Sequence, residues 1–233
     1  MRKQTKARCR YCEAKYAKSG MIKHLRGCKE RKKEIEGAEK EKKCGYFMIA
    51  VTGRYAKPYW MILECQESLT LKELDDFLRD IWLECCGHLS CFRIYERNFF
   101  RETFEDDYWE EEDRDMNFPL KTVLEEGTEF THIYDFGDTT ELMLTVIESY
   151  EASKKKEKIK IAARNESPEI LCTECGENSV KWICTSCLYR GELSWICEEC
   201  EQDHSCDQEM FLPVVNSPRC GICAYSGSEI YED

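Results

Sequence analysis

The chain has 233 residues, of which 42% are hydrophobic and 12% aromatic; a wholly disordered chain is therefore excluded, and there is material for one medium domain with satellites or two small domains. Seventeen cysteines against four histidines are far above ordinary usage. The net charge of −12 hides an asymmetry that excludes a uniformly acidic surface, because residues 1–43 carry 16 Lys and Arg against 6 Asp and Glu whereas the rest of the chain is acidic.

The sequence predicts a soluble, cytoplasmic protein. Its longest purely apolar run, residues 47–51, is shorter than the ~7–15 apolar residues of a secretory signal and far shorter than the ~20 of a membrane helix. In a reducing compartment, clustered Cys-x-x-Cys pairs indicate metal ligands rather than disulfides.

Composition divides the chain into four segments. They are a finger in residues 1–28, a charged linker or solvated helix in 29–43, an aromatic-rich body in 44–164 and a second cysteine-rich segment in 165–233.

The first cysteine and histidine group has the spacing of a zinc finger. Its candidate ligands are Cys9, Cys12, His24 and Cys28. A two-residue spacer lets both thiolates bind one ion, and a three-residue spacer places His24 and Cys28 one helical turn apart. We expect one structural zinc ion here.

The body begins with two predicted strands, residues 46–51 and 59–65. Thr70 begins a helix, because Glu73 follows three residues later as the reciprocal capping partner. Apolar residues then recur at spacings of three and four down to about Cys85, and Gly87 ends the helix.

The second half of the body contains shorter elements. They are a strand at 91–95, an acidic exposed loop at 105–115, a helical turn at 120–124, a strand at 130–134, a tight turn at 135–138 and a strand at 142–147. In the turn we expect Gly137 to adopt a positive φ and the aspartates to accept hydrogen bonds from turn amides. The element order predicts an α+β fold, a β-grasp-like sheet with one long helix across it.

The body resembles the plasmid pRiA ORF-three-like family, which includes the TnpR passenger proteins of some insertion elements. The resemblance covers roughly residues 46–150 and is carried by the runs at 58–60, 69–74, 87–89, 92–94, 127–130 and 134–138. The turn Tyr-Asp-Phe-Gly-Asp at 134–138 is its most specific mark. The family implies a small α+β domain without an established activity. Both cysteine-rich ends depart from its pattern.

The second cysteine-rich segment offers ten candidate ligands for two tetrahedral zinc ions. They are Cys172, Cys175, Cys184, Cys187, Cys197, Cys200, His204, Cys206, Cys220 and Cys223. The spacing resembles a B-box, in which ligand pairs alternate between two ions.

That resemblance implies two ligand sets. The first consists of Cys172, Cys175, Cys197 and Cys200. The second contains Cys184, Cys187 and His204, with its fourth place open to Cys206, Cys220 or Cys223. About three structural Zn²⁺ ions per chain are therefore expected. Thiolates saturate these sites, whereas a catalytic zinc keeps an open position for water.

Other chemistry-bearing residues have plainer interpretations. A kinase is excluded at Asp135, because no glycine-rich phosphate loop or His-Arg-Asp loop is present. Asp135, Asp138 and Glu141 could instead bind a divalent cation. His88 is interpreted as a cap or a packed residue. The cysteines without paired spacing are interpreted as small core residues: Cys44, Cys65, Cys85, Cys86 and Cys91.

Three functions remain open. In the first, a non-catalytic zinc-binding protein contacts RNA or a ribonucleoprotein through residues 1–43, aided by the basic strip at 154–160, and contacts proteins through its acidic body and C-terminal zinc module. The second is a protein–protein adaptor without nucleic acid. The third is a metal-dependent enzyme that uses Asp135 and Asp138. The missing nucleophile–base pair favours the first over the enzyme.

Overall fold

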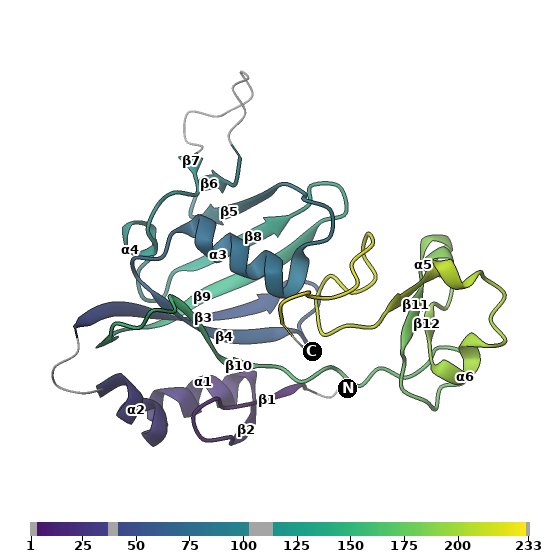
Figure 1. Cartoon of the computed structure of the whole chain (residues 1–233), viewed down its shortest axis with the longest axis horizontal. Helices are drawn as coiled ribbons and strands as arrows, with labels where there is room; N and C mark the ends of the chain where they lie inside the picture. The colour runs from purple at the N-terminus through teal and green to yellow at the C-terminus, as the bar shows by residue number, and fades with distance from the viewer. Residues whose placement is uncertain (1–3, 37–41, 103–113, 232–233) are drawn as a thin grey trace. The chain divides into compact units, whose positions relative to one another are not determined.

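Our computed structural model describes residues 4–36, 42–102 and 114–231. The chain forms two compact units (Figure 1). The first contains Met1–Leu78 and Leu89–Glu166, and the second contains Arg79–His88 and Ser167–Asp233. The second unit is therefore assembled from two segments that are far apart in the sequence.

The first unit is built on an eight-stranded sheet with the order β10-β4-β3-β9-β8-β5-β6-β7. Its strands are β3 (Lys43–Gly53), β4 (Trp60–Gln66), β5 (Ser90–Ile94), β6 (Arg97–Phe100), β7 (Arg114–Asp115), β8 (Glu129–Tyr134), β9 (Thr140–Ser153) and β10 (Ile159–Arg164). Neighbouring strands are antiparallel, except that β6 and β7 are parallel. The predicted α+β class is confirmed.

Helix α3 (Leu71–Leu78) crosses the sheet in the view of Figure 1. It begins at the predicted capping pair: the amide of Thr70 donates to Oε2 of Glu73 at 2.9 Å, and the amide of Glu73 donates to Oγ1 of Thr70 at 3.2 Å. The α-helix is shorter than predicted, because the chain continues after Leu78 as a π-helix, Arg79–Leu83, which belongs to the second unit. The predicted helical turn at 120–124 is α4 (Leu120–Val123).

The N-terminal finger and the helix that follows it, together called the finger from here on, are part of the first unit. Its elements are β1 (Lys6–Arg8), β2 (Lys15–Ala17), α1 (Lys18–Gly27) and α2 (Lys29–Glu36). Met21 and Leu25 of α1 share one buried cluster with Trp60 and Ile62 of β4. Arg31 of α2, which is almost fully buried, donates from Nε to Oε1 of Glu64 at 2.6 Å. The finger is thus docked on the sheet rather than held on a free arm.

This docking explains the uninterrupted apolar sequence of β4. All seven of its residues are buried. Successive side chains of a strand point to opposite faces, so Met61 and Leu63 point away from the face on which Trp60 and Ile62 meet the finger. A strand that is covered on both faces needs no polar alternation.

The second unit contains small elements, and one of its buried clusters is made largely of cysteine. Its elements, besides the π-helix, are β11 (Trp182–Cys184), α5 (Thr185–Arg190), β12 (Trp195–Ile196), α6 (Glu198–Glu201), a 3₁₀ turn (Gln208–Met210) and β13 (Phe211–Pro213). Cys184, Cys187 and Ile196 form a buried cluster, against which Cys200, Cys206 and Phe211 pack. So small an apolar cluster is typical of modules that depend on a metal for stability.

Several sequence predictions need correction or lie outside the described residues. The positive φ in the turn at 135–138 belongs to Asp135, with φ 64°, so the prediction for Gly137 is wrong. The strands β6 and β10 were not predicted. The acidic loop at 105–115 lies mostly outside the described residues; Arg114 and Asp115 form β7. No helix in the described part of the chain is long and apolar enough to cross a membrane.

Candidate metal centres

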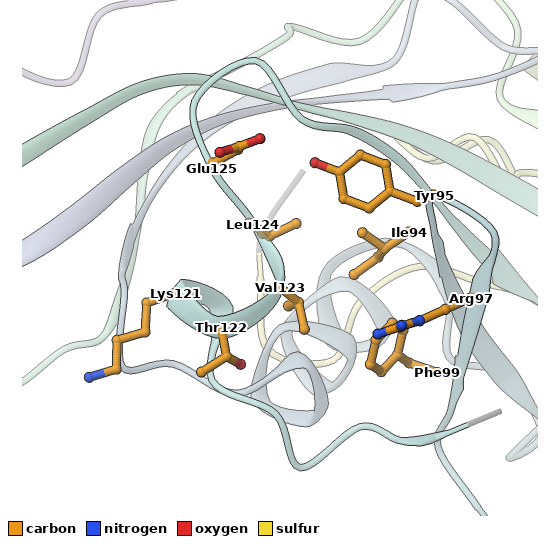
Figure 2. Close-up of a pocket in the computed structure, with 9 residues that line it drawn as sticks. All are labelled: Ile94, Tyr95, Arg97, Phe99, Lys121, Thr122, Val123, Leu124 and Glu125. Atoms are coloured by element: carbon orange, nitrogen blue, oxygen red, sulfur yellow. The ribbon is translucent and has the colours of Figure 1, made fainter. Parts of the chain in front are cut away.

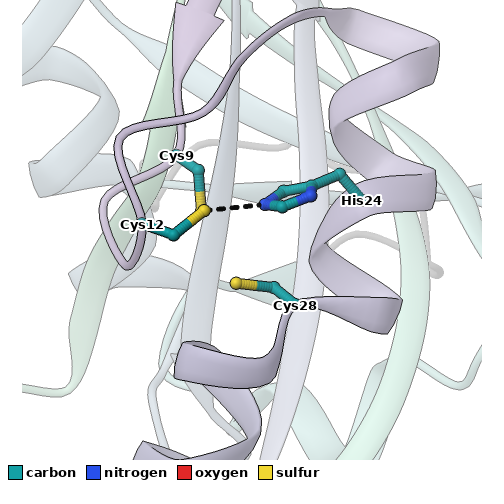
Figure 3. Close-up of side chains that lie close together, drawn as sticks. All are labelled: Cys9, Cys12, His24 and Cys28. Carbon is teal, nitrogen blue, oxygen red and sulfur yellow. Dashed lines mark hydrogen bonds between the residues drawn. The ribbon is translucent and has the colours of Figure 1, made fainter.

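The first candidate centre lies in the finger (Figure 3). Its residues are Cys9, Cys12, His24 and Cys28, whose ligand atoms all lie within 4.8 Å of one another. Sγ of Cys12 is 3.2 Å from Nε2 of His24, the contact that is dashed in Figure 3. The ring of Tyr16 stacks on the imidazole of His24, with centroids 4.8 Å apart, and this stacking orients the imidazole.

Local backbone hydrogen bonds shape the loop that carries the first two thiols. The amide of Cys9 donates to the carbonyl of Ala14 at 2.9 Å, and the amide of Glu13 donates to the carbonyl of Cys9 at 2.8 Å. His24 lies on α1 and Cys28 directly follows that helix, so their three-residue spacing brings both to the loop.

The thiols of this set differ in acidity. Burial raises the pKa of Cys9 to about 11. Burial also acts on Cys28, but hydrogen bonds from backbone amides, that of Arg31 first, outweigh it and lower its pKa. One thiolate is thus favoured beside a protonated thiol, and a bound cation would allow the remaining protons to leave.

Two further sets lie in the second unit and alternate along the chain. One consists of Cys172, Cys175, Cys197 and Cys200, and the other of Cys184, Cys187, His204 and Cys206. Within each set the ligand atoms lie within 4.8 Å of one another. Cys206 thus occupies the place that the sequence left open among three cysteines.

Antiparallel pairing between β11 and β12 places the two sets at opposite ends of the strand pair. Trp182 pairs with Ile196 and Ile183 pairs with Trp195, so Cys184 at the end of β11 and Cys197 directly after β12 lie at opposite ends of the pair. Each then leads into a short helix, α5 or α6, that carries the next thiol of its set.

Electrostatics favours the thiolate at one cysteine of each set. Burial raises the pKa of Cys172, but backbone amides that donate to its sulfur outweigh this effect and lower the pKa to about 6. A hydrogen bond from Arg190 lowers the pKa of Cys206 to about 6, whereas burial raises that of Cys187 to about 12.

His204 has the partner that a metal-bound imidazole usually has. Its Nε2 lies 3.3 Å from Sγ of Cys187, inside the set, while its Nδ1 lies 2.6 Å from Oε1 of Glu174, outside it. Burial disfavours the imidazolium, but the carboxylate of Glu174 outweighs it and raises the pKa of His204 to about 9. A carboxylate that accepts from the distal ring nitrogen fixes the tautomer that leaves Nε2 free to bind a metal.

A fourth set combines residues that the sequence did not group. It consists of Cys85, Cys86, His88 and Cys223, all in the second unit. Sγ of Cys223 lies 3.7 Å from Sγ of Cys86 and 3.7 Å from Nε2 of His88. The hydrogen bond with His88 lowers the pKa of Cys223 to about 7. Cys86 is exposed, so its interpretation as a core residue is wrong.

The contact distances fit tetrahedral coordination. In a zinc site with Zn–S bonds of ~2.3 Å and Zn–N bonds of ~2.0 Å, two sulfurs are ~3.8 Å apart and a sulfur and a nitrogen ~3.5 Å. The sulfur pairs Cys175–Cys197, Cys187–Cys206 and Cys86–Cys223 are 3.9, 3.7 and 3.7 Å apart. None of the seventeen cysteines is in a disulfide. The four sets could therefore each hold a metal ion.

The remaining cysteines are not in these sets. Cys65 and Cys91 are buried, as expected for small core residues, and Cys44 is half-buried. Cys220, a predicted ligand, accepts a hydrogen bond from the amide of Val215 at 3.3 Å and is in none of the four sets. Of the pair Cys220 and Cys223, only Cys223 thus belongs to a candidate metal set.

The Asp135 turn uses its carboxylate for structure. Oδ1 of Asp135 accepts from the amides of Gly137 at 3.0 Å and Asp138 at 3.3 Å. Oε2 of Glu141 pairs with Arg54 at 2.7 Å. Within the described ranges, the groups of metal-ligand atoms that lie close together are the four cysteine-containing sets, and this turn is not among them.

Asp75 and His132 form a buried pair inside the first unit. Nε2 of His132 and Oδ1 of Asp75 are 2.6 Å apart, and both side chains are fully buried. The other oxygen of Asp75 pairs with Arg101. Burial opposes the charge on Asp75, but His132 and Arg101 outweigh it and lower its pKa. With no access for a substrate, this pair has a structural role.

A pocket of about 460 Å³ lies in the first unit between the end of β5 and the segment after α4 (Figure 2). Its lining combines apolar side chains such as Ile94 and Leu124 with Tyr95 and Glu125. The hydroxyl of Tyr95 lies 3.3 Å from Oγ1 of Thr128. The lining residues contain no cysteine, histidine or serine.

Comparison with known proteins gives a family match but little further information. The family model described as plasmid pRiA4b ORF-3-like protein matches residues 47–176. No curated protein matches the chain. Five solved chains match, and one of them is protein MM3350 of unknown function from Methanosarcina mazei Go1, at 14% identity and a TM-score of 0.45 over 52% of this chain and 69% of that one.

Proposed function

The chain belongs to the plasmid pRiA4b ORF-3-like protein family, and we propose that this member is a non-catalytic zinc-binding protein that binds RNA or a ribonucleoprotein through its finger and a protein through its C-terminal zinc module. The observation that carries the proposal is a group of exposed, unpaired cations on a finger that is docked on the sheet.

Zinc is the metal that the donor sets favour. The three sets expected from the sequence consist of thiolates with at most one imidazole, and tetrahedral sites of this composition are typical of structural zinc. Four protein ligands leave no open position for a substrate or an activated water. The metal would therefore stabilise the finger and the C-terminal module and take no part in a reaction.

Some cations of the finger pair with carboxylates of the chain, and others are exposed and make no ion pair within the described part of the chain. Arg31 is buried against Glu64, and the exposed Lys33 pairs with Glu30. The exposed cations of the described finger whose side chains make neither an ion pair nor a hydrogen bond with a described residue are Lys6, Arg10, Lys23, Lys29 and Lys32. Free lysines and arginines bind phosphates by releasing condensed counterions. Tyr16, which is 39% exposed, lies on the same segment and offers a stacking surface for an unpaired base.

The C-terminal module offers a different surface. Three apolar side chains on and after α5 are exposed: Leu188, Tyr189 and Leu193, of which Tyr189 is 95% exposed. Exposed apolar and aromatic groups that lie near one another often mark protein contacts. They also support the second candidate, a protein–protein adaptor without nucleic acid.

A salt titration separates these candidates. Binding of the zinc-loaded full chain to single-stranded RNA and to duplex DNA is measured by fluorescence anisotropy between low and physiological salt. If about five cations meet phosphates, log affinity should fall with log salt at a slope of about −4. Changing all five free cations to Gln should reduce the slope to near zero.

The matched control changes five exposed cations of the body to Gln, with the same loss of charge: Lys57, Lys72, Arg93, Arg97 and Lys121. It should keep the slope of the wild type. Equally weak binding by the wild type and both variants at low salt would refute the RNA proposal and leave the adaptor.

A further inference from the structure

We propose that Cys85, Cys86, His88 and Cys223 bind a fourth zinc ion, which fastens the segment Arg79–His88 to the C-terminal segment and so completes the second unit. Three of these ligands come from four consecutive residues, and the fourth comes from 135 positions further along the chain than His88. This site goes beyond the proposed function, which needs only the three other sets.

The backbone is shaped to present the three clustered ligands. Gly87, between Cys86 and His88, adopts a left-handed conformation with φ 71°. Such a φ is readily accessible to glycine, and it turns the chain so that residues on either side can face one point. Oε1 of Glu84 accepts from the amide of Gly87 at 2.6 Å, which fixes the turn.

Arg79 donates hydrogen bonds to both ends of this loop. Its Nε donates to Oε2 of Glu84 at 2.7 Å, and its Nη1 donates to the carbonyl of His88 at 2.9 Å. The guanidinium, which is nearly buried, thus ties the two ends of the ligand loop to the π-helix. Preorganisation of this kind is what a high-affinity metal site requires.

The C-terminal segment is attached to the π-helix independently of the ligands. Oγ of Ser217 donates to the carbonyl of Trp82 at 2.6 Å, and Oγ of Ser228 donates to the carbonyl of Asp80 at 2.5 Å. Cys223 lies between these two anchors in sequence. It adopts a left-handed φ of 53°, which is uncommon for a residue with a side chain and indicates that a constraint holds its thiol in place.

The charges around the site are balanced for a metal with three thiolates. Zn²⁺ with three thiolates and a neutral imidazole carries one net negative charge. Arg219, whose side chain is fully buried, donates from Nη2 to Sγ of Cys85 at 3.4 Å. The zinc–thiolate group would thus be a negative partner for this buried guanidinium.

The test is the zinc content of the full chain, measured by native mass spectrometry after loading with zinc and removal of the excess. We expect four zinc ions per chain in the wild type and three in Cys223→Ser. The matched control is Cys220→Ser, which changes the neighbouring member of the same Cys-x-x-Cys pair and should keep four ions.

Thiol alkylation of the wild type tests the site even if Cys223→Ser does not fold. In the zinc-loaded chain, N-ethylmaleimide should leave Cys86 and Cys223 unmodified although both are exposed, and a chelator should make them reactive. Three zinc ions in the wild type, or alkylation of Cys86 and Cys223 in the fully loaded chain, would overturn the proposal. The same result with the three other sets filled would leave the proposed function intact.

Discussion

Nε2 of His88 lies 3.7 Å from Sγ of Cys223, although 135 positions separate the two residues. The first belongs to a segment that interrupts the first unit in the sequence and the second to the C-terminal segment, yet both lie in the second unit. Zinc bound to the set that contains His88 and Cys223 therefore shows that the two segments of the second unit have come together. Each of the three other sets lies in one continuous region of the chain, so zinc bound there does not show this.

The contact between Glu174 and His204 should tune metal affinity. Glu174→Ala removes the acceptor that lies 2.6 Å from Nδ1 of His204 and should weaken zinc binding at that set by about 10–100-fold. Competition with a chromophoric chelator measures the effect. Glu177→Ala, an exposed carboxylate three positions away, is the control; an equal loss in both variants would argue against a role for Glu174.

The Arg31–Glu64 pair should dock the finger. Removal of one partner leaves a buried charge without compensation, so Arg31→Met should cost about 3–5 kcal/mol of unfolding free energy. The double variant Arg31→Met/Glu64→Leu should be more stable than the sum of the single changes predicts. Urea denaturation of all four proteins gives the coupling energy.

The exposed pair Lys33–Glu30 on the same helix is the control. Its coupling should stay below about 1 kcal/mol, because solvent screens it. Similar coupling energies in the two cycles would contradict the docking role of Arg31.

The Asp75–His132 pair should make the first unit sensitive to acid. Because the pKa of Asp75 is lowered by folding, its charge contributes stability above its unfolded pKa of ~3.9 and that stability is lost as pH falls through the folded pKa. The stability advantage of the wild type over Asp75→Asn should therefore be constant near neutral pH and shrink below about pH 4. Denaturation at a series of pH values measures it; an advantage that grows at low pH would contradict the assignment.

The Asp135 turn should depend on backbone conformation rather than on charge. Asp135→Asn keeps an acceptor for the turn amides and tolerates the φ of 64°, so it should cost less than about 0.5 kcal/mol. Asp135→Val should cost about 1–3 kcal/mol, since a β-branched residue is strained at positive φ. Equal losses of stability in the two Asp135 variants would show that the carboxylate charge matters. If the wild type bound Mn²⁺ and Asp138→Asn did not, a metal site at this turn would have to be reconsidered.

Local signals in the sequence predicted much of the first unit. The reciprocal pair of Thr70 and Glu73 marked the start of α3, because a capping box is a short-range interaction. Strand β10 was missed because the lysines before and within it look like a solvated strip; Lys158, directly before the strand, pairs with Glu73 at 2.5 Å, a partner that only the fold supplies. The residue type of Gly137 predicted that the positive φ would lie there. In the structure Asp135 has the positive φ, and the hydrogen bond that its carboxylate accepts from the amide of Gly137 holds that conformation.

Spacing predicted the ligand sets that lie within one region and failed across regions. Cys9 and Cys12 could be grouped with His24 because their spacing alone defines a finger. The group Cys85, Cys86 and His88 is incomplete without Cys223, and no local rule connects them. The run Cys-Cys-x-His was a signal, since it places three potential ligands within four residues, but it did not identify the fourth ligand.

Zinc K-edge X-ray absorption of the fully loaded full chain tests the central claim, that these are closed, structural zinc sites, most directly. The four sets together contain thirteen cysteines and three histidines. The account predicts four-coordinate zinc with, on average, about three sulfurs at ~2.3 Å and about one nitrogen at ~2.0 Å. A first shell with two or fewer sulfurs per zinc, or with bound water, would contradict it.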